Sequence, residues 1–224
     1  MRTFLARWGL ISRKMRWGIT LRGLLSIMLT LGILITLTIF LLHPFLALNK
    51  PSPNAKLLII DGPIPEYAVQ AAVKEFHSGN YQLMIATGGP ISRGYLVPDI
   101  KSYPQLVAAS LIHQQFDSSK IVVVDRDAVI TDRTYANAVS LKDWLQSSSG
   151  NYEAINIFSM GTHARRTRLL YQKALPKSVE VGVLATPNLE YDRSNWWRSS
   201  MGFRLVIGEG IAYIYARFLF RSGS

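Results

Sequence analysis

The longest apolar run in the chain extends from Leu24 to Leu42 and contains no charged residue. As an α-helix these nineteen residues span about 28 Å, close to the roughly 30 Å hydrocarbon core of a bilayer. The pattern predicts one N-terminal transmembrane helix over residues 23–48. It also predicts the lipid bilayer as a partner, contacted through residues 24–42.

A basic segment over residues 1–22 precedes this helix and contains no acidic residue. Basic flanks stay on the cytoplasmic side, so we expect a single-pass protein of the plasma (inner) membrane, with a cytoplasmic N-terminus and an extracytoplasmic C-terminal domain. The alternative is a cleaved signal peptide, whose apolar region runs for about 7–15 residues and ends in small residues. The longer run here, followed by Phe45-Leu46-Ala47-Leu48, favours an uncleaved anchor.

After the anchor, the polar and proline-containing residues 49–55 are typical of a linker. Beyond them, short aliphatic runs alternate with segments that have the apolar spacing of a helix, such as the spacing from Val69 to Phe76. This alternation predicts an α/β domain over residues 56–220: three layers, Rossmann-like, with a mainly parallel sheet. The predicted strands are Leu57–Ile60, Leu83–Ala86, Ile121–Val124, Ile155–Phe158 and Val179–Leu184.

The composition and charge of the chain argue against several classes of function. The chain has no cysteine, which excludes disulfides, thiolate metal sites and a cysteine nucleophile. The net charge of +11 is concentrated before Asp61, the first acidic residue, and the chain from Lys50 onward is only mildly basic. We therefore expect no nucleic-acid partner. The other three histidines form no ligand spacing with His163, so we expect no metal site, and the sequence identifies no cofactor.

Candidate site residues follow from the rule that ligands bind beyond the carboxyl ends of parallel strands. Asp61 ends the first predicted strand, and Gly88 and Gly89 follow the second, where backbone N–H groups can approach an anion. The alternative for the glycines is an ordinary tight turn. Thr134 and Asn137 share the inward face of the next helix, where they either bond to the scaffold or meet a ligand.

The fourth predicted strand leads into Ser159-Met160-Gly161-Thr162-His163-Ala164-Arg165-Arg166. Arginine at a helix N-terminus is mildly unfavourable unless an anion lies nearby, so Arg165 and Arg166 point to an anionic ligand. The alternative is that both arginines point into water. His163 and Arg166 share one helix face and suit a general acid or base beside a phosphate-binding cation, although a lone histidine is also a common structural group.

Three further positions carry local predictions. Asp132 is placed to cap the helix that contains Thr134. Glu209 lies within a last apolar helix over residues 205–220, where a carboxylate argues against a second membrane span and favours pairing with an arginine of the same domain. Trp196 and Trp197 either fill the core beneath a loop, stack on a ring or touch lipid headgroups.

Taken together, these motifs resemble the YdcF-like (DUF218) family of bacterial envelope proteins, which includes SanA and ElyC. The resemblance covers about residues 56–220. Its motifs are Thr87-Gly88-Gly89, Thr134-x-x-Asn137-Ala138 and His163-x-x-Arg166, and a subgroup also has runs similar to Trp196-Trp197-Arg198-Ser199-Ser200 and to residues 208–217.

The resemblance implies a Rossmann-like domain tethered to the inner membrane, with cell envelope or peptidoglycan roles in some members and S-adenosylmethionine binding proposed for one. The chain departs from the family pattern at Asp61-Gly62-Pro63, where the family is glycine-rich. It departs again near Glu66-Tyr67, where an arginine is often found.

Our leading hypothesis is an envelope protein whose exported domain binds or processes a phosphate-bearing precursor. Gly88, Gly89 and Arg166 hold the phosphate in this hypothesis, while His163 and Asp61 transfer protons. Thr134 and Asn137 orient the ligand. One alternative is a binder of S-adenosylmethionine or a nucleotide-like cofactor, and another is a non-catalytic scaffold.

Overall fold

The computed structural model describes residues 7–8, 11–13, 17–91 and 99–221, so part of the basic segment over residues 1–22 lies outside the described residues. The chain forms two compact units, Met1–His43 and Pro44–Ser224. In the first unit, β1 (Ile11–Arg13) pairs in antiparallel fashion with β2 (Trp17–Ile19). The helix α2 (Leu21–Leu46) follows, close to the predicted range of 23–48.

The helix α2 has the properties of a membrane span. It is long and apolar enough to cross a bilayer, and its most apolar window is exposed, unlike the core helix of a soluble protein. Its hydroxyl groups are satisfied within the helix, because Ser26, Thr30, Thr36 and Thr38 each donate to the carbonyl four residues earlier at 2.8–2.9 Å. Hydroxyls bonded in this way need no water, which suits a hydrocarbon environment.

The second unit is built on a five-stranded parallel sheet with the order β5-β4-β3-β6-β7. Every predicted strand is present, and the predicted α/β class is confirmed. The central strand β3 is buried along its whole length, as its aliphatic sequence requires. The strands are β3 (Leu57–Asp61), β4 (Leu83–Gly88), β5 (Ile121–Asp125), β6 (Ala154–Met160) and β7 (Glu180–Thr186).

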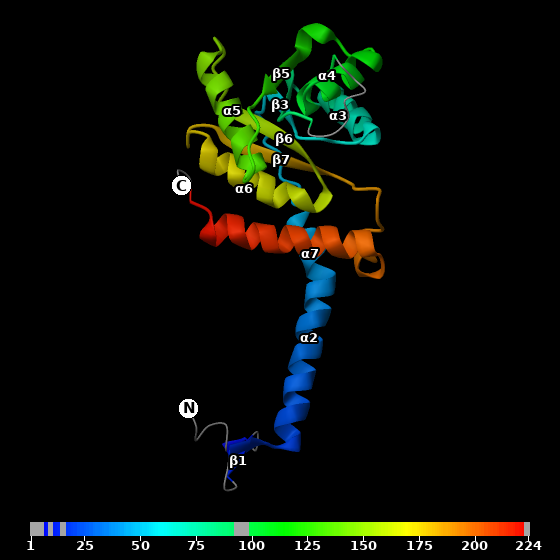
Figure 1. Ribbon diagram of the computed structural model, residues 1–224, viewed down its shortest axis with the longest axis vertical. Coiled ribbons are helices and arrows are strands. Elements are labelled where there is room, and N and C mark those ends of the chain that lie inside the picture. Colours follow the sequence, from blue (N-terminus) through cyan, green and yellow to red (C-terminus); the bar gives the residue numbers. More distant parts are fainter. Residues whose placement is uncertain (1–6, 9–10, 14–16, 92–98, 222–224) are drawn as a thin grey trace. The chain divides into compact units, whose positions relative to one another are not determined.

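Helices cover both faces of the sheet (Figure 1). Leu57 and Ile59 of β3 pack with α5 (Arg133–Ser147) and α6 (Ala164–Ala174). Leu58 and Ile60 point the other way and pack with α3 (Glu66–Ser78) and α4 (Tyr103–His113). The alternation of side chains along a strand thus divides the core into two layers.

The final helix, α7 (Ser200–Ile214), packs against α6 and continues into a π-helical turn, η4 (Tyr215–Leu219). It begins earlier than the predicted residue 205. A short turn, η3 (Trp196–Arg198), precedes α7. Trp196 is buried there against Trp197 and Phe203, so of the alternatives for this residue, filling the core is the one the structure supports.

Residues 49–55, predicted as a linker, belong to the compact unit of the domain. Lys50 exchanges two backbone hydrogen bonds with Val183 of β7, at 2.8 and 2.9 Å. The Asn156 side chain accepts from the Ser52 backbone N–H at 2.7 Å and donates to the Ser52 carbonyl at 3.0 Å. The chain leaving α2 is therefore fastened to the sheet.

This attachment predicts a steric effect at Gly182, where an added Cβ would lie 2.3 Å from the backbone nitrogen of Ser52 and 2.0 Å from Oδ1 of Asn156. We expect Gly182→Ala to lower the free energy of unfolding by roughly 1–3 kcal/mol, because overpacking forces the segment off the sheet. The measurement is thermal unfolding of the full chain in detergent. The matched control is Gly208→Ala in α7, where a Cβ meets nothing within 4 Å; equal midpoints for the two variants would contradict the prediction.

Candidate functional site

The candidate site lies where the order of strands reverses. The chain runs from β3 outward through β4 to β5, then returns to place β6 on the other side of β3. Beyond this junction is a cleft of about 850 Å³. Ligands in open α/β sheets bind at such a point, as the sequence analysis expected.

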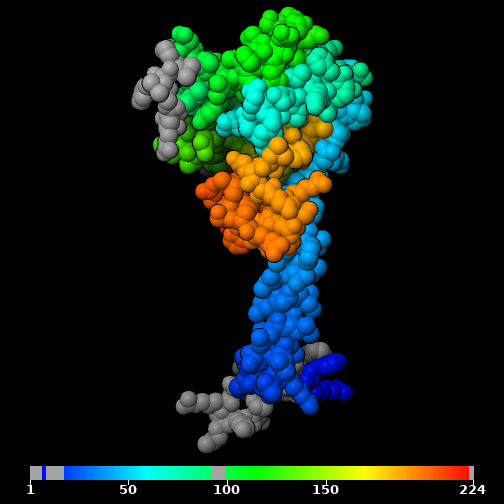
Figure 2. Space-filling model, turned by 90° about the vertical axis from the view of Figure 1, so that its right-hand side faces the viewer, coloured from blue at the N-terminus to red at the C-terminus, as the bar shows by residue number. Residues whose placement is uncertain are grey.

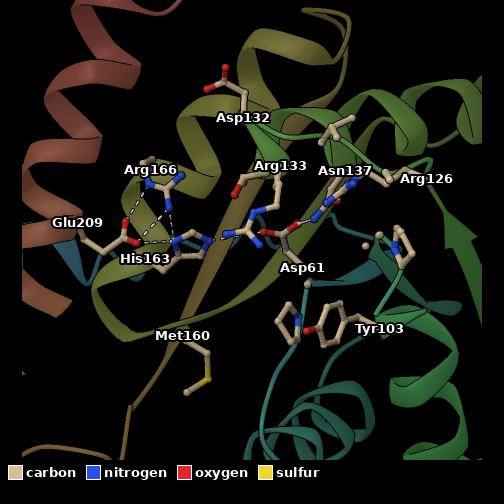
Figure 3. Close-up of a pocket in the computed structure, with 18 of the residues that line it drawn as sticks. Asp61, Tyr103, Arg126, Asp132, Arg133, Asn137, Met160, His163, Arg166 and Glu209 are labelled. Atoms are coloured by element: carbon tan, nitrogen blue, oxygen red, sulfur yellow. Dashed lines mark hydrogen bonds and ion pairs between the residues drawn. The ribbon is translucent and has the colours of Figure 1, made fainter. Parts of the chain in front are cut away.

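The cleft brings together nearly all the predicted site residues (Figure 3). Asp61, Gly88, Gly89, Thr134, Asn137, His163 and Arg166 line it. Arg165 is not among the described lining residues. Its guanidinium lies 3.9 Å from the ring centroid of Phe45, and its Nε donates to the Phe45 carbonyl. The two adjacent arginines therefore face different surroundings.

Asp61 is a buried carboxylate held from one side. Its Oδ1 accepts from Nδ2 of Asn137 and from the hydroxyl of Tyr171, both at 2.8 Å. Burial and then the charge of Asp61 raise the pKa of Tyr171 well above its ordinary value, so this hydroxyl stays protonated as a donor. With Oδ1 occupied, Oδ2 of Asp61 faces Nε2 of His163 at 3.7 Å.

Asn137 connects Asp61 to an arginine that the sequence analysis did not single out. While its Nδ2 donates to Asp61, its Oδ1 accepts from Nε of Arg126 at 2.6 Å. Of the two predicted roles for Asn137, the structure shows bonding to the scaffold. Burial, together with the charge of nearby Arg133, lowers the pKa of Arg126.

His163 lies between two carboxylates. Its Nδ1 is 3.0 Å from Oε1 of Glu209 and 2.9 Å from Nη2 of Arg166. Glu209 in turn accepts from Nε and Nη2 of Arg166, at 2.8 and 3.0 Å. The prediction that Glu209 pairs with an arginine of the same domain is confirmed, and so is the proximity of His163 and Arg166.

The electrostatic balance of this group favours a protonated imidazole. Burial alone lowers the pKa of His163, but hydrogen bonds to Asp61 and Glu209 outweigh burial and raise it overall. Burial acts to raise the pKa of Glu209, and the hydrogen bond and charge of His163, with those of Arg166, lower it to about 2. A neutral His163 can instead accept from Arg166 at Nδ1, so the ring keeps its place in either protonation state.

Other predicted positions have structural roles that the sequence did not reveal. Gly89 makes room for Arg126, because a Cβ there would lie 2.5 Å from Nη1 of that arginine. The Gly88 carbonyl accepts from the Arg126 backbone N–H at 3.0 Å. Asp132 occupies the N-cap position of α5 but makes no capping hydrogen bond with its side chain, since its backbone is left-handed, with φ of 51°.

Thr134 and Arg133 both line the cleft. Thr134 as a whole is 8% exposed, and its hydroxyl is not among the buried polar atoms of the described residues that lack a hydrogen-bond partner. Arg133 points into the cleft toward Asp61, whereas Asp132 points away (Figure 3). Arg126 and Arg133 were missed because they lie in and beside an irregular loop, where hydrophobic periodicity carries no signal.

The described residues contain no group of three or more His, Cys, Asp or Glu side chains arranged to hold a metal ion. The arrangement instead offers a carboxylate and an imidazole for proton transfer, with arginines close by. An oxygen atom to one side of the 3.7 Å gap between Oδ2 of Asp61 and Nε2 of His163 could lie at hydrogen-bond distance, about 2.8 Å, from both.

The pairing of Glu209 predicts a pH-dependent stability. Because the pKa of His163 is raised on folding, protonated His163 contributes fully to stability below pH 6.5, the ordinary pKa of histidine. This contribution is lost as the pH rises through the pKa of His163 in the folded protein. Ionised Glu209 contributes to stability above pH 4.5, the ordinary pKa of glutamate, and this contribution is lost as the pH falls toward about 2, its pKa in the folded protein. We expect Glu209→Gln to remove the contribution of Glu209 and to reduce that of His163, whose pKa falls although Asp61 still faces it. The cost is about 1–3 kcal/mol of stability, less than for a fully buried pair.

Histidine NMR titration and unfolding of the full chain in detergent across pH measure these effects. His163→Gln assigns the resonance among the four histidines of the chain. Asp143→Asn, at an exposed surface carboxylate, is the control. An unchanged His163 titration in Glu209→Gln would show that Glu209 does not govern this imidazole.

Comparison of the chain with models of known protein families finds no match, and comparison with curated proteins finds none. The resemblance to the YdcF-like family therefore stays a prediction from the motifs quoted above. What is established is an α/β domain with a Rossmann-like sheet, preceded by one helix suited to a membrane.

Proposed function

We propose that this chain is a single-pass membrane protein of the YdcF-like family whose α/β domain binds, and processes, a phosphate-bearing ligand of the cell envelope. The exposed apolar α2 supports the membrane anchor. The basic segment before α2 supports a cytoplasmic N-terminus and an extracytoplasmic domain. The motif resemblance supports a role in envelope or peptidoglycan biogenesis.

The observation that carries the proposed ligand class is the pair of arginines beside Asp61 and His163. Among the described residues, neither Arg126 nor Arg133 has a carboxylate within 4.0 Å, whereas Arg166 is neutralised by Glu209. Two guanidinium groups in one cleft without an ion pair of their own suit a phosphate, which accepts several charge-assisted hydrogen bonds. In this proposal Arg126 and Arg133 are the main anion-binding groups, and Arg166 positions His163.

The remaining lining residues complete the proposed mechanism. Thr134 offers its hydroxyl to the ligand from the lining of the cleft. Gly88 and Gly89 also line the cleft, and Gly89 leaves the room that the guanidinium of Arg126 occupies. Protonated His163, whose Nε2 lies 3.7 Å from Oδ2 of Asp61, donates a proton to a leaving oxygen. In the neutral tautomer whose Nδ1–H donates to Glu209, Nε2 instead accepts a proton from an attacking water.

Removal of one cleft charge tests the ligand class. We expect Arg133→Gln to weaken binding of a phosphate-bearing ligand by roughly 10-fold or more, as expected for loss of a charged hydrogen bond. The measurement is calorimetric titration of the full chain, in phosphate-free detergent, with phosphomonoesters, a polyprenyl phosphate and S-adenosylmethionine.

Lys142→Gln is the matched control, because it removes the same charge from the same helix, α5, outside the described lining of the cleft. Saturable binding of S-adenosylmethionine alone would favour the cofactor alternative. Absence of binding by every compound would favour a non-catalytic scaffold and contradict the proposal.

The proposed orientation is testable because the chain has no cysteine. A single cysteine is introduced by Ser149→Cys in the exposed turn after α5. If the domain is extracytoplasmic, this cysteine should react with a membrane-impermeant maleimide in cells whose outer membrane is permeabilised and whose inner membrane is intact. The control is the unsubstituted chain, which has nothing to label. Reaction only after cell lysis would place the domain in the cytoplasm and reverse the proposed topology.

A further inference from the structure

The helix α7 has two opposite faces, one that lines the cleft and one that is exposed and apolar. Leu205 and Glu209, four residues apart, line the cleft. On the other side, an apolar stripe is exposed, with Ile211 at 65% and Phe218 of the following π-helical turn at 75%. The whole stripe consists of Phe203, Ile211, Ile214 and Phe218, whose spacing keeps them on one side of the helix. In Figure 2, α7 (orange to red) forms part of the outer surface of the domain.

This stripe lies on the helix that receives the end of α2. The ring of Phe45 packs edge-on against Tyr213 of α7, with centroids 5.5 Å apart. Arg165 covers the same ring, and Leu46 is completely buried. These contacts lie within the compact unit that begins at Pro44, so no flexible tether separates the last turn of α2 from α7. The apolar run that ends at Leu42 is therefore only three residues away, along the chain, from a residue that contacts α7.

The charges on α7 also suit a lipid surface. From Ser199 to Arg221 the chain has three basic residues, Arg204, Arg217 and Arg221, and a single acidic residue, Glu209. Glu209 is turned inward to His163 and Arg166, so it presents no carboxylate on the exposed stripe. An apolar stripe with arginines beside it is typical of helices that lie in a membrane interface, where arginine side chains extend toward the headgroups.

We infer that α7 and its π-helical turn lie in the headgroup region of the bilayer that α2 spans, with the Phe203–Phe218 stripe facing the lipid. This inference rests on the membrane span of the proposed function. Its consequence is that the cleft, lined by the opposite side of α7, lies about one helix diameter from the lipid. A phosphate attached to a lipid by a flexible link is the ligand that this arrangement suits.

The test uses the full chain in lipid nanodiscs, with single cysteines introduced into the cysteine-free sequence and labelled with an environment-sensitive fluorophore. The probe positions are Phe203→Cys and Ile211→Cys. Ile112→Cys, on α4 and outside the described lining of the cleft, is the control for an exposed apolar residue away from α7, since Ile112 is 55% exposed. Leu34→Cys, in the middle of α2, reports the membrane span itself.

Quenching by lipids that carry a doxyl group near the headgroup separates the outcomes. We expect the quenching of the two α7 probes to be at least about twofold stronger than that of Ile112→Cys, as for an interfacial helix. Quenching no greater than at Ile112→Cys, while Leu34→Cys is quenched by mid-chain doxyl lipids, would overturn the inference and leave the membrane span intact. Lack of quenching at Leu34→Cys would overturn the span as well.

A further outcome identifies a different occupant of the stripe. If the α7 probes report an apolar environment that doxyl lipids do not quench, a second copy or another protein covers the stripe, and the lipid inference is wrong. The substituted side chains are exposed, so the variants should fold. Thermal unfolding checks this point, and Ile214→Cys provides a second probe of the same stripe.

Discussion

The pairing of β3 with β6 is the constraint on which the site depends. In parallel register, Ile60 of β3 lies beside Phe158 of β6, so the two strands end together. Asp61 emerges from one strand, and the turn to His163 follows the other. Chain segments about a hundred residues apart therefore deliver a carboxylate and an imidazole to the same point. No local interaction between the two residues is needed to bring them together.

The charge balance around His163 extends this constraint to the last helix. Arg166 lies one turn after His163, so the two are neighbours by helix geometry. Two positive groups at this distance repel each other, and Glu209 supplies the compensating charge from α7. The position of α7 on α6 is thus linked to the protonation state of His163. A displacement of α7 would leave an arginine and an imidazolium facing each other without a shared anion.

Much of the fold was predictable because buried parallel strands leave a strong aliphatic signal, and all five predicted strands are present. The attachment of residues 49–55 was not predictable, since Lys50 binds Val183 through backbone groups that any residue supplies. The missing side-chain cap at Asp132 depends on a left-handed backbone, which its sequence does not specify. The residue types in a segment predict its structure well where burial decides that structure. They predict it poorly where backbone hydrogen bonds or backbone dihedral angles decide it.

The candidate site shows the same division. Residues at strand ends, such as Asp61, and in short motifs, such as His163 and Arg166, could be selected from sequence because topology fixes where strands end. Their partners could not, because the contact of Glu209 with His163 spans 46 residues and that of Tyr171 with Asp61 spans 110. The sequence indicated that Glu209 needs an arginine but did not identify which one. Arg126 gave no periodic signal at all.

The helix α7 belongs both to the candidate site, through Glu209, and to the exposed apolar surface of the domain. Its inner face supplies a carboxylate that helps to raise the pKa of His163, and its outer face exposes an apolar surface that water does not favour. Phe45, three residues after the apolar run of α2 ends, packs on the same helix. Through Glu209, contact of α7 with lipid would favour the packing in which His163 and Arg166 share a carboxylate. Membrane attachment and site chemistry would then be stabilised by the same helix.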